Sequence, residues 1–172
     1  MTTTSDTTVT LQVRAIDPDV LSQLRRRDDA GHPPRLIIDE DGGSPLRCCL
    51  RLSRAGERVA LVSYAPLCRW AYETGADPGP YDEVGPVFIH PAPCPGPDGP
   101  GYPAALTGCP RVFRAYSASG RILAGRLAGR AETQNAASAE AILAGIFADP
   151  AVAVVHARAV DFGCFTFEVR RG

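Results

Sequence analysis

Hydrophobic and polar residues alternate along several short stretches of the chain, which predicts a protein built mainly of β-strands. The clearest stretch is residues 9–16 (VTLQVRAI), where apolar residues recur at every second position, as in a strand with one buried face. Further strands are expected at residues 35–39, 47–52, 58–64 and 85–90, and as two hairpins over residues 111–127 and 151–171.

Helical signals occur at two places. Asp17 and Pro18 begin the segment DPDVLSQL, where they suit the N-cap and the first helical position. The segment SAEAILAGIFADP, residues 138–150, has apolar residues at helical spacing and ends at a proline. Residues 65–84 are expected to be irregular, and residues 91–103, rich in proline and glycine, to form a surface loop.

Most of the expected strands follow one another through turns rather than through helices. This order predicts a single α+β domain over residues 9–172, with a mainly antiparallel sheet and about two helices packed on one side of it. Residues 1–8 are expected to be a flexible tail.

The composition narrows the classes of partner. A net charge of −1 and a pI near 6.3 give no basic surface for a nucleic acid, so none is expected as a partner. No apolar run approaches the roughly 20 residues that span a bilayer, and the start of the chain lacks the features of an export signal. We therefore expect a cytoplasmic protein that has no membrane partner.

The residue types argue against Schiff-base chemistry and against chemistry that needs a metal or another cofactor. All 18 basic residues are arginine, so no lysine is present for Schiff-base chemistry. The six cysteines include no C-x-x-C pair, and Cys48 and Cys49 would lie on opposite faces of the expected strand. The common glycine-rich nucleotide and phosphate motifs are also absent. Neither a metal nor another cofactor is therefore expected.

The last hairpin carries the most concentrated group of polar side chains. If a three-residue loop ends with a left-handed Gly163, then His156 faces Glu168, and Arg158 faces Thr166. These side chains, with Cys164, would share one face, and the apolar side chains would occupy the other: Phe165, Phe167 and Val169. The polar face is either the floor of a pocket or a solvated surface with cross-strand ion pairs.

Histidines and arginines supply the candidate site residues. His156 and His90 are the candidates for acid and base, because an imidazole with a pKa of about 6.5 both takes and gives protons near neutrality. An anionic substrate would bind Arg47, Arg114 and Arg158. The remaining candidates are two tyrosines, one carboxylate and one thiol: Tyr116, Tyr81, Glu83 and Cys164.

Four blocks of the sequence stand out in this order: LRCCLRLSRAGERVALVSYAP, YDEVGPVFIH, RVFRAYSASGRI and FADPAVAVVHARAVDFGCF. Together they resemble a bacterial family of unassigned function, DUF1203. The family pattern has Pro-Cys-Arg where this chain has Pro45, Leu46 and Arg47. The resemblance implies no activity, but it places Arg47, Arg114, His156 and Arg158 within motif blocks, which favours their belonging to one site.

These observations lead to one main hypothesis and two alternatives. The main hypothesis is a cofactor-independent isomerase, lyase or cyclase in which His156 and His90 transfer protons on a small anionic metabolite, as in specialised biosynthesis. The first alternative is a non-enzymatic module that binds an anionic ligand or a peptide. The second is an interaction protein that forms a homodimer through an exposed sheet edge.

Overall fold

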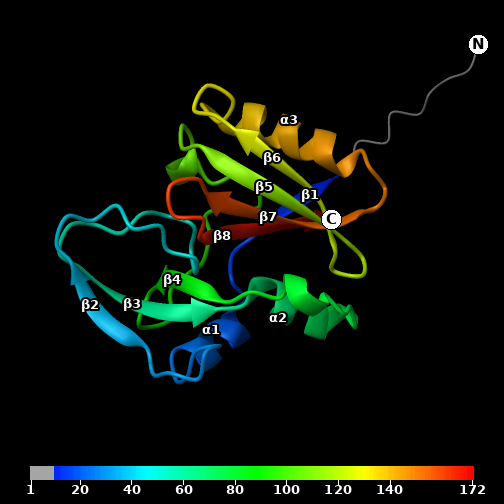
Figure 1. Ribbon diagram of the computed structural model, residues 1–172. Helices are drawn as coiled ribbons and strands as arrows, with labels where there is room; N and C mark the ends of the chain where they lie inside the picture. Colours follow the sequence, from blue (N-terminus) through cyan, green and yellow to red (C-terminus); the bar gives the residue numbers. More distant parts are fainter. Residues whose placement is uncertain (1–9) are drawn as a thin grey trace, which may run out of the picture.

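The larger of two antiparallel sheets contains five strands in the order β1-β8-β7-β5-β6 (Figure 1). The computed structural model describes residues 10–172, so the expected tail at residues 1–8 and the start of the first expected strand lie outside the described residues. The strands are β1 (Leu11–Arg14), β5 (Arg111–Ser117), β6 (Ile122–Ala128), β7 (Val152–Ala159) and β8 (Phe165–Arg171).

The smaller sheet has the order β2-β3-β4 and is also antiparallel. It consists of β2 (Arg35–Asp39), β3 (Glu57–Tyr64) and β4 (Gly85–Ile89). Phe165, at the start of β8, packs into the core of this sheet and contacts Tyr64 edge-on, with a ring separation of 5.3 Å. Phe165 therefore joins the start of β8 to the apolar core of the smaller sheet.

Within residues 10–172, three α-helices cover these sheets: α1 (Pro18–Leu24), α2 (Pro66–Thr74) and α3 (Ala136–Phe147). Two short 3-10 helices, Gly79–Tyr81 and Ala104–Leu106, lie in the connections. These elements confirm the α+β class with mainly antiparallel sheets. They correct the expected helix arrangement, because Figure 1 shows α3 on one side of the larger sheet and α1, α2 and the smaller sheet on the other.

Apolar contacts explain this two-sided arrangement. Leu143 and Phe147 of α3 pack with Phe113 and Val155 on one face of the larger sheet. Trp70 of α2 packs on the other face, in a cluster with Tyr116 and Val154 of β5 and β7. Both faces of the larger sheet are therefore covered at β5 and β7, whereas the sequence predicted helices on one side only, and the edge strand β6 is mostly exposed.

Helix α1 begins where the sequence predicted, whereas helix α3 begins earlier than predicted. The Asp17 side chain accepts a hydrogen bond of 2.8 Å from the Asp19 backbone N–H, and Pro18 begins α1. Helix α3 begins two residues before Ser138, since Asn135 is its N-cap and its side chain accepts a hydrogen bond from the Ser138 N–H.

The prediction that residues 65–84 are irregular was wrong in part, because this stretch contains α2.

The expected strand at residues 47–52 was also wrong. This segment is a tight turn in which the Leu50 N–H donates a hydrogen bond of 2.8 Å to the Leu46 carbonyl. Leu50 has φ +58°, the left-handed region that non-glycine residues rarely occupy. Two isolated β-bridges hold the ends of the turn. Pro45 pairs with Leu52, and Leu46 pairs with Phe88 of β4.

No helix among residues 10–172 is long and apolar enough to cross a membrane.

Candidate functional site

The last hairpin buries His156 instead of presenting it in a pocket. His156 is opposite Glu168, as the sequence predicts, and its Nε2 lies 3.3 Å from Glu168 Oε2. Its side chain is 0% exposed, and its ring packs 5.0 Å from Tyr116 and 5.3 Å from Phe165. Burial lowers the pKa of His156, against the effect of Glu168, so the imidazole is held neutral in the interior.

The register beyond His156 differs from the prediction. Arg158 pairs with Phe165 and not with Thr166, because a β-bulge follows Ala157. Gly163 has φ +70°, as expected for the turn. The bulge places Phe165 against His156, so Phe165 does not share a face with Phe167 as the sequence predicted.

Two of the arginines predicted to bind an anionic substrate, Arg114 and Arg158, form ion pairs with Glu83 of the protein itself. Arg114 lies directly opposite His156 in the sheet, and its guanidinium is 2.5 Å from Glu83. The Arg158 guanidinium is 2.9 Å from the same carboxylate oxygen. The structure thus brings Arg114, Arg158, Glu83 and His156 together. The buried Tyr116 ring lies 5.0 Å from His156, and the exposed Tyr81 is close to Glu83 in sequence.

Arg47 is inside the protein, where its guanidinium fastens the turn to β8. It is 3% exposed, its Nε donates a hydrogen bond of 2.8 Å to the Phe165 carbonyl, and its Nη1 donates to the Pro45 carbonyl. Burial lowers the pKa of Arg47 to about 10. Cys164 lies in the hairpin connection, half-buried, with its sulfur 3.6 Å from the Phe162 carbonyl.

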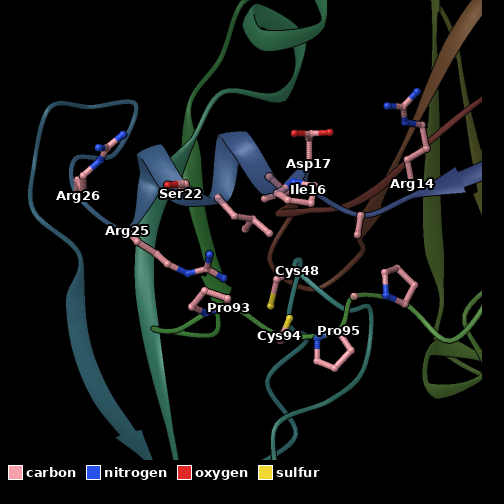
Figure 2. Close-up of a pocket in the computed structure, with 15 residues that line it drawn as sticks. Arg14, Ile16, Asp17, Ser22, Arg25, Arg26, Cys48, Pro93, Cys94 and Pro95 are labelled. Carbon is pink, nitrogen blue, oxygen red and sulfur yellow. The ribbon is translucent and has the colours of Figure 1, made fainter.

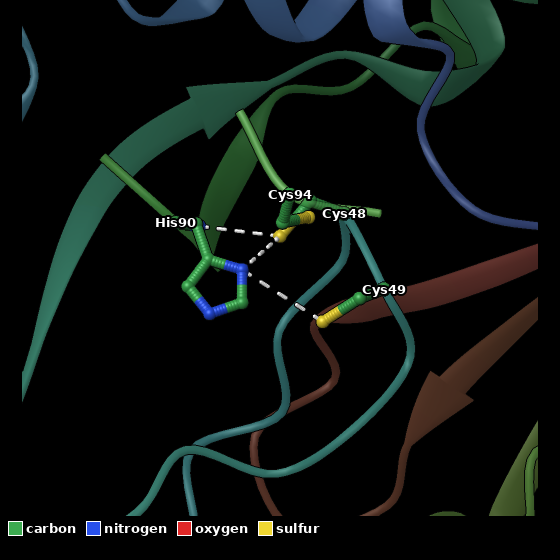
Figure 3. Close-up of side chains that lie close together, drawn as sticks. All are labelled: Cys48, Cys49, His90 and Cys94. Carbon is green, nitrogen blue, oxygen red and sulfur yellow. Dashed lines mark hydrogen bonds between the residues drawn. The ribbon is translucent and has the colours of Figure 1, made fainter. Parts of the chain in front are cut away.

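His90 belongs to a separate group of side chains, at the end of β4. Its Nδ1 is 3.2 Å from Cys48 Sγ and 3.8 Å from Cys49 Sγ. Cys94, from the proline-rich loop, completes the group, and the four ligand-capable atoms all lie within 4.8 Å of one another. Figure 3 shows the three sulfurs gathered on one side of the imidazole.

The turn at residues 46–50 explains why both adjacent cysteines face the same histidine. A strand would have directed Cys48 and Cys49 to opposite faces, whereas the turn brings both sulfurs to His90. The His90 backbone N–H also donates to Cys48 Sγ at 3.2 Å. The sequence prediction missed Cys48, Cys49 and Cys94, although the spacing His90-x-x-x-Cys94 was a signal for them.

An acidic residue and an arginine orient the outer nitrogen of the imidazole. Glu57 Oε1 is 3.1 Å from His90 Nε2, and Arg51 holds both carboxylate oxygens at 2.6 and 3.0 Å. Hydrogen bonding from Arg51 lowers the pKa of Glu57 to about 2. Arg51 Nη2 is also 2.7 Å from Nε2, so Nε2 either accepts from Arg51 or donates to Glu57.

The two adjacent thiols behave as a pair. A hydrogen bond from Cys48, opposed by burial, lowers the pKa of Cys49 to about 6. The same contact and burial raise the pKa of Cys48. The first proton lost from these two sulfurs therefore belongs to the pair rather than to either thiol alone.

Two cavities flank this group, and the proline-rich loop separates them. The larger, of about 680 Å³, lies between α1 and the loop, and Cys48 and Cys94 form part of its wall (Figure 2). The smaller, of about 470 Å³, is lined by Cys49, His90 and the same part of the loop. His156 is not among the residues that line either cavity, so the two histidines do not face a shared space.

The larger cavity has an excess of positive charge. Its charged lining consists of Arg14, Arg25 and Arg26 against the single carboxylate of Asp17, which also caps α1. Arg25 Nε donates a hydrogen bond of 3.0 Å to the His90 carbonyl, and Arg25 Nη2 is buried without a hydrogen-bond partner among the described residues. The wall therefore suits an anion.

These features define an α+β protein with a cysteine and histidine cluster beside an arginine-lined cavity. The family described as "Protein of unknown function (DUF1203)" matches residues 43–171, so the chain belongs to this family, as the sequence blocks indicated. The match includes all four members of the cluster. No curated protein and no solved structure matches the chain.

Proposed function

We propose that the protein binds a small anionic molecule in the cavity between α1 and the proline-rich loop. The observation that carries this proposal is a cavity of about 680 Å³ whose charged lining residues are three arginines and one aspartate. Planar guanidinium groups bind carboxylates and phosphates through two hydrogen bonds at once, which suits them to small anions.

Of the three arginines, Arg25 is the one whose guanidinium is already held in place for binding an anion. Its hydrogen bond to the His90 carbonyl fixes the guanidinium beside Pro93 and Cys94, as Figure 2 shows. Its Nη2 has no hydrogen-bond partner among the described residues, so this donor is still unpaired when an anion enters. An unsatisfied buried donor is costly, and a ligand oxygen that accepts from it removes that cost.

The geometry favours binding over proton transfer by His156. This side chain is 0% exposed and packs against the rings of Tyr116 and Phe165, so a substrate would reach it only if the surrounding structure opened. His90 has both ring nitrogens engaged, one with sulfurs and the other with Glu57 and Arg51. The acid–base enzyme remains a prediction, and unchanged turnover in His156→Gln on an identified substrate would remove it.

Calorimetric titration with small anions tests the proposal. Citrate, malonate, inorganic phosphate and a panel of carboxylate and phosphate metabolites would be titrated into the wild type and into Arg25→Gln. A charge-assisted hydrogen bond contributes about 1.5–3 kcal/mol, so the variant should bind about 10- to 150-fold more weakly.

The matched control is Arg121→Gln, at an exposed arginine in the turn between β5 and β6. It should bind like the wild type. Equal weakening in both variants would indicate general attraction of anions to the surface, and the absence of binding across the panel would refute the proposal.

A further inference from the structure

Four soft ligand atoms come together at one point from three separate segments of the chain. Cys48 and Cys49 come from the tight turn, His90 from the end of β4, and Cys94 from the proline-rich loop. Cysteine sulfur and histidine nitrogen are the ligands of structural zinc sites, most often in a group of four. No anion-binding role accounts for this grouping, because thiols do not attract anions.

The separations agree with a tetrahedral ion. Zinc lies about 2.3 Å from sulfur and about 2.0–2.1 Å from nitrogen, so tetrahedral ligand atoms are roughly 3.5–3.8 Å apart. Nδ1 of His90 is 3.2 and 3.8 Å from the sulfurs of Cys48 and Cys49, and no pair within the cluster exceeds 4.8 Å. Closure around an ion would require movements of only about 1 Å.

We propose that Cys48, Cys49, His90 and Cys94 bind one Zn²⁺ ion as a four-coordinate site. Thiolate and imidazole ligands favour zinc over hard cations such as magnesium and calcium. Four protein ligands leave no open position, which is the arrangement of a structural rather than a catalytic zinc. Binding would release the protons of the three thiols to the solvent.

The residues around the cluster provide the support that zinc ligands receive in proteins. A ligating histidine usually donates its other ring N–H to a carboxylate, and Glu57 stands 3.1 Å from Nε2 for this purpose. With Nδ1 bound to zinc, Nε2 would carry the hydrogen and donate to Glu57. Arg51 Nη2, 2.7 Å from Nε2, would then turn from the ring, because both groups are donors, while Arg51 still holds that carboxylate. The His90 backbone N–H, 3.2 Å from Cys48 Sγ, would stabilise the thiolate.

The charges of the site are also compatible. Three thiolates and one Zn²⁺ ion leave one net negative charge. Arg51 lies beside the imidazole, and Arg25 is bonded to the His90 carbonyl, so two guanidinium groups are near enough to offset it. This proposal rests on the cluster alone and does not depend on the anion cavity.

Metal analysis and cobalt substitution of the full chain test the proposal. The purified protein should contain one zinc per chain by mass spectrometry of the metal. After removal of the zinc under reducing conditions, titration with Co²⁺ should produce visible bands of tetrahedral intensity and thiolate charge-transfer absorption that saturate at one equivalent. Added Zn²⁺ should abolish both.

Two substitutions at one ligand separate binding from folding. Cys94→Ser, on the loop, should lose stoichiometric Co²⁺ binding, whereas Cys94→His should keep it with weaker charge-transfer absorption, because one of three thiolates is gone. The control is Cys68→Ser, at an exposed cysteine of α2, which should keep the wild-type spectrum. Circular dichroism would confirm that each variant is folded.

Several results would overturn the proposal. The reduced, folded wild type could take up no Co²⁺ or Zn²⁺. Alternatively, Cys94→Ser and Cys68→Ser could bind the metal equally well, which would place the ion elsewhere. Rapid alkylation of Cys49 that saturating Zn²⁺ does not slow would instead indicate a reactive thiol beside His90.

Discussion

Acidification should destabilise the protein through His156, whose neutral form is buried against Glu168. Burial lowers the pKa of His156, and the charges of Arg158 and Arg114 act in the same direction, against Glu168. The unfolded chain therefore binds a proton near pH 6.5 that the folded chain does not bind until the pH is lower. For a histidine with a lowered folded-state pKa, stability is complete at neutral pH and is lost as the pH falls.

The size of the effect follows from proton linkage. Each pH unit below about 6.5 costs up to about 1.4 kcal/mol while the folded state remains unprotonated at this site. Between pH 6.5 and 5 the loss attributable to His156 is therefore at most about 2 kcal/mol. The pKa of Glu168 is lowered despite burial, because His156 and Arg170 stabilise its charge, so its contribution to stability is lost only at lower pH.

Urea unfolding at pH 7, 6, 5.5 and 5 measures this loss in the wild type and in His156→Gln. The glutamine amide can donate to Glu168 but does not titrate, so the variant should have the shallower dependence on pH. His32→Gln, at an exposed residue of the turn before β2, should keep the wild-type dependence. Equal slopes for the wild type and His156→Gln would refute the reasoning.

Three further substitutions test the other contacts. Glu57→Gln should weaken zinc binding about 10- to 100-fold by loss of the carboxylate partner of His90, measured by competition with a chelator, and an unchanged affinity would contradict this. Arg47→Met should lower the free energy of unfolding by about 2–4 kcal/mol, since it leaves two interior carbonyls without a donor; a loss below about 0.5 kcal/mol in urea unfolding would argue against it. Glu83→Gln should cost less than about 1 kcal/mol in the same assay, because its carboxylate is 42% exposed, and a loss above about 2 kcal/mol would show that the ion pairs matter more.

Alternation of side chains was sufficient to predict much of the fold. The expected strand at residues 35–39 has the observed bounds, and the pairing of His156 with Glu168 was predicted correctly. Two residues later the same reasoning failed for Arg158, because a bulge leaves Thr166 without a partner in the ladder. A bulge depends on packing between sheets, here the position of Phe165, and leaves no mark on the local pattern.

The candidate site was harder to predict because it depends on tertiary contacts. Residues 47–52 alternate like a strand, yet Leu46 pairs with β4 and the following residues turn back in a tight loop. Their polarity could not indicate this turn, since it includes a leucine in the left-handed region. Arg47 lies among motif residues for a structural reason, as its guanidinium bridges the turn and β8.

The loop segment around Cys94 lies between the two cavities and also belongs to the cysteine and histidine cluster, so it can couple the binding of zinc to the binding of an anion. Residues Pro93–Gly96 line both cavities, and Cys94 is also a member of the cluster. If zinc holds this segment in one position, an anion that prefers that position must bind more tightly to the zinc-loaded protein. By thermodynamic reciprocity, the anion must then increase the affinity for zinc by the same factor. Loss of the zinc would thus release anion at concentrations at which the zinc-loaded protein retains it.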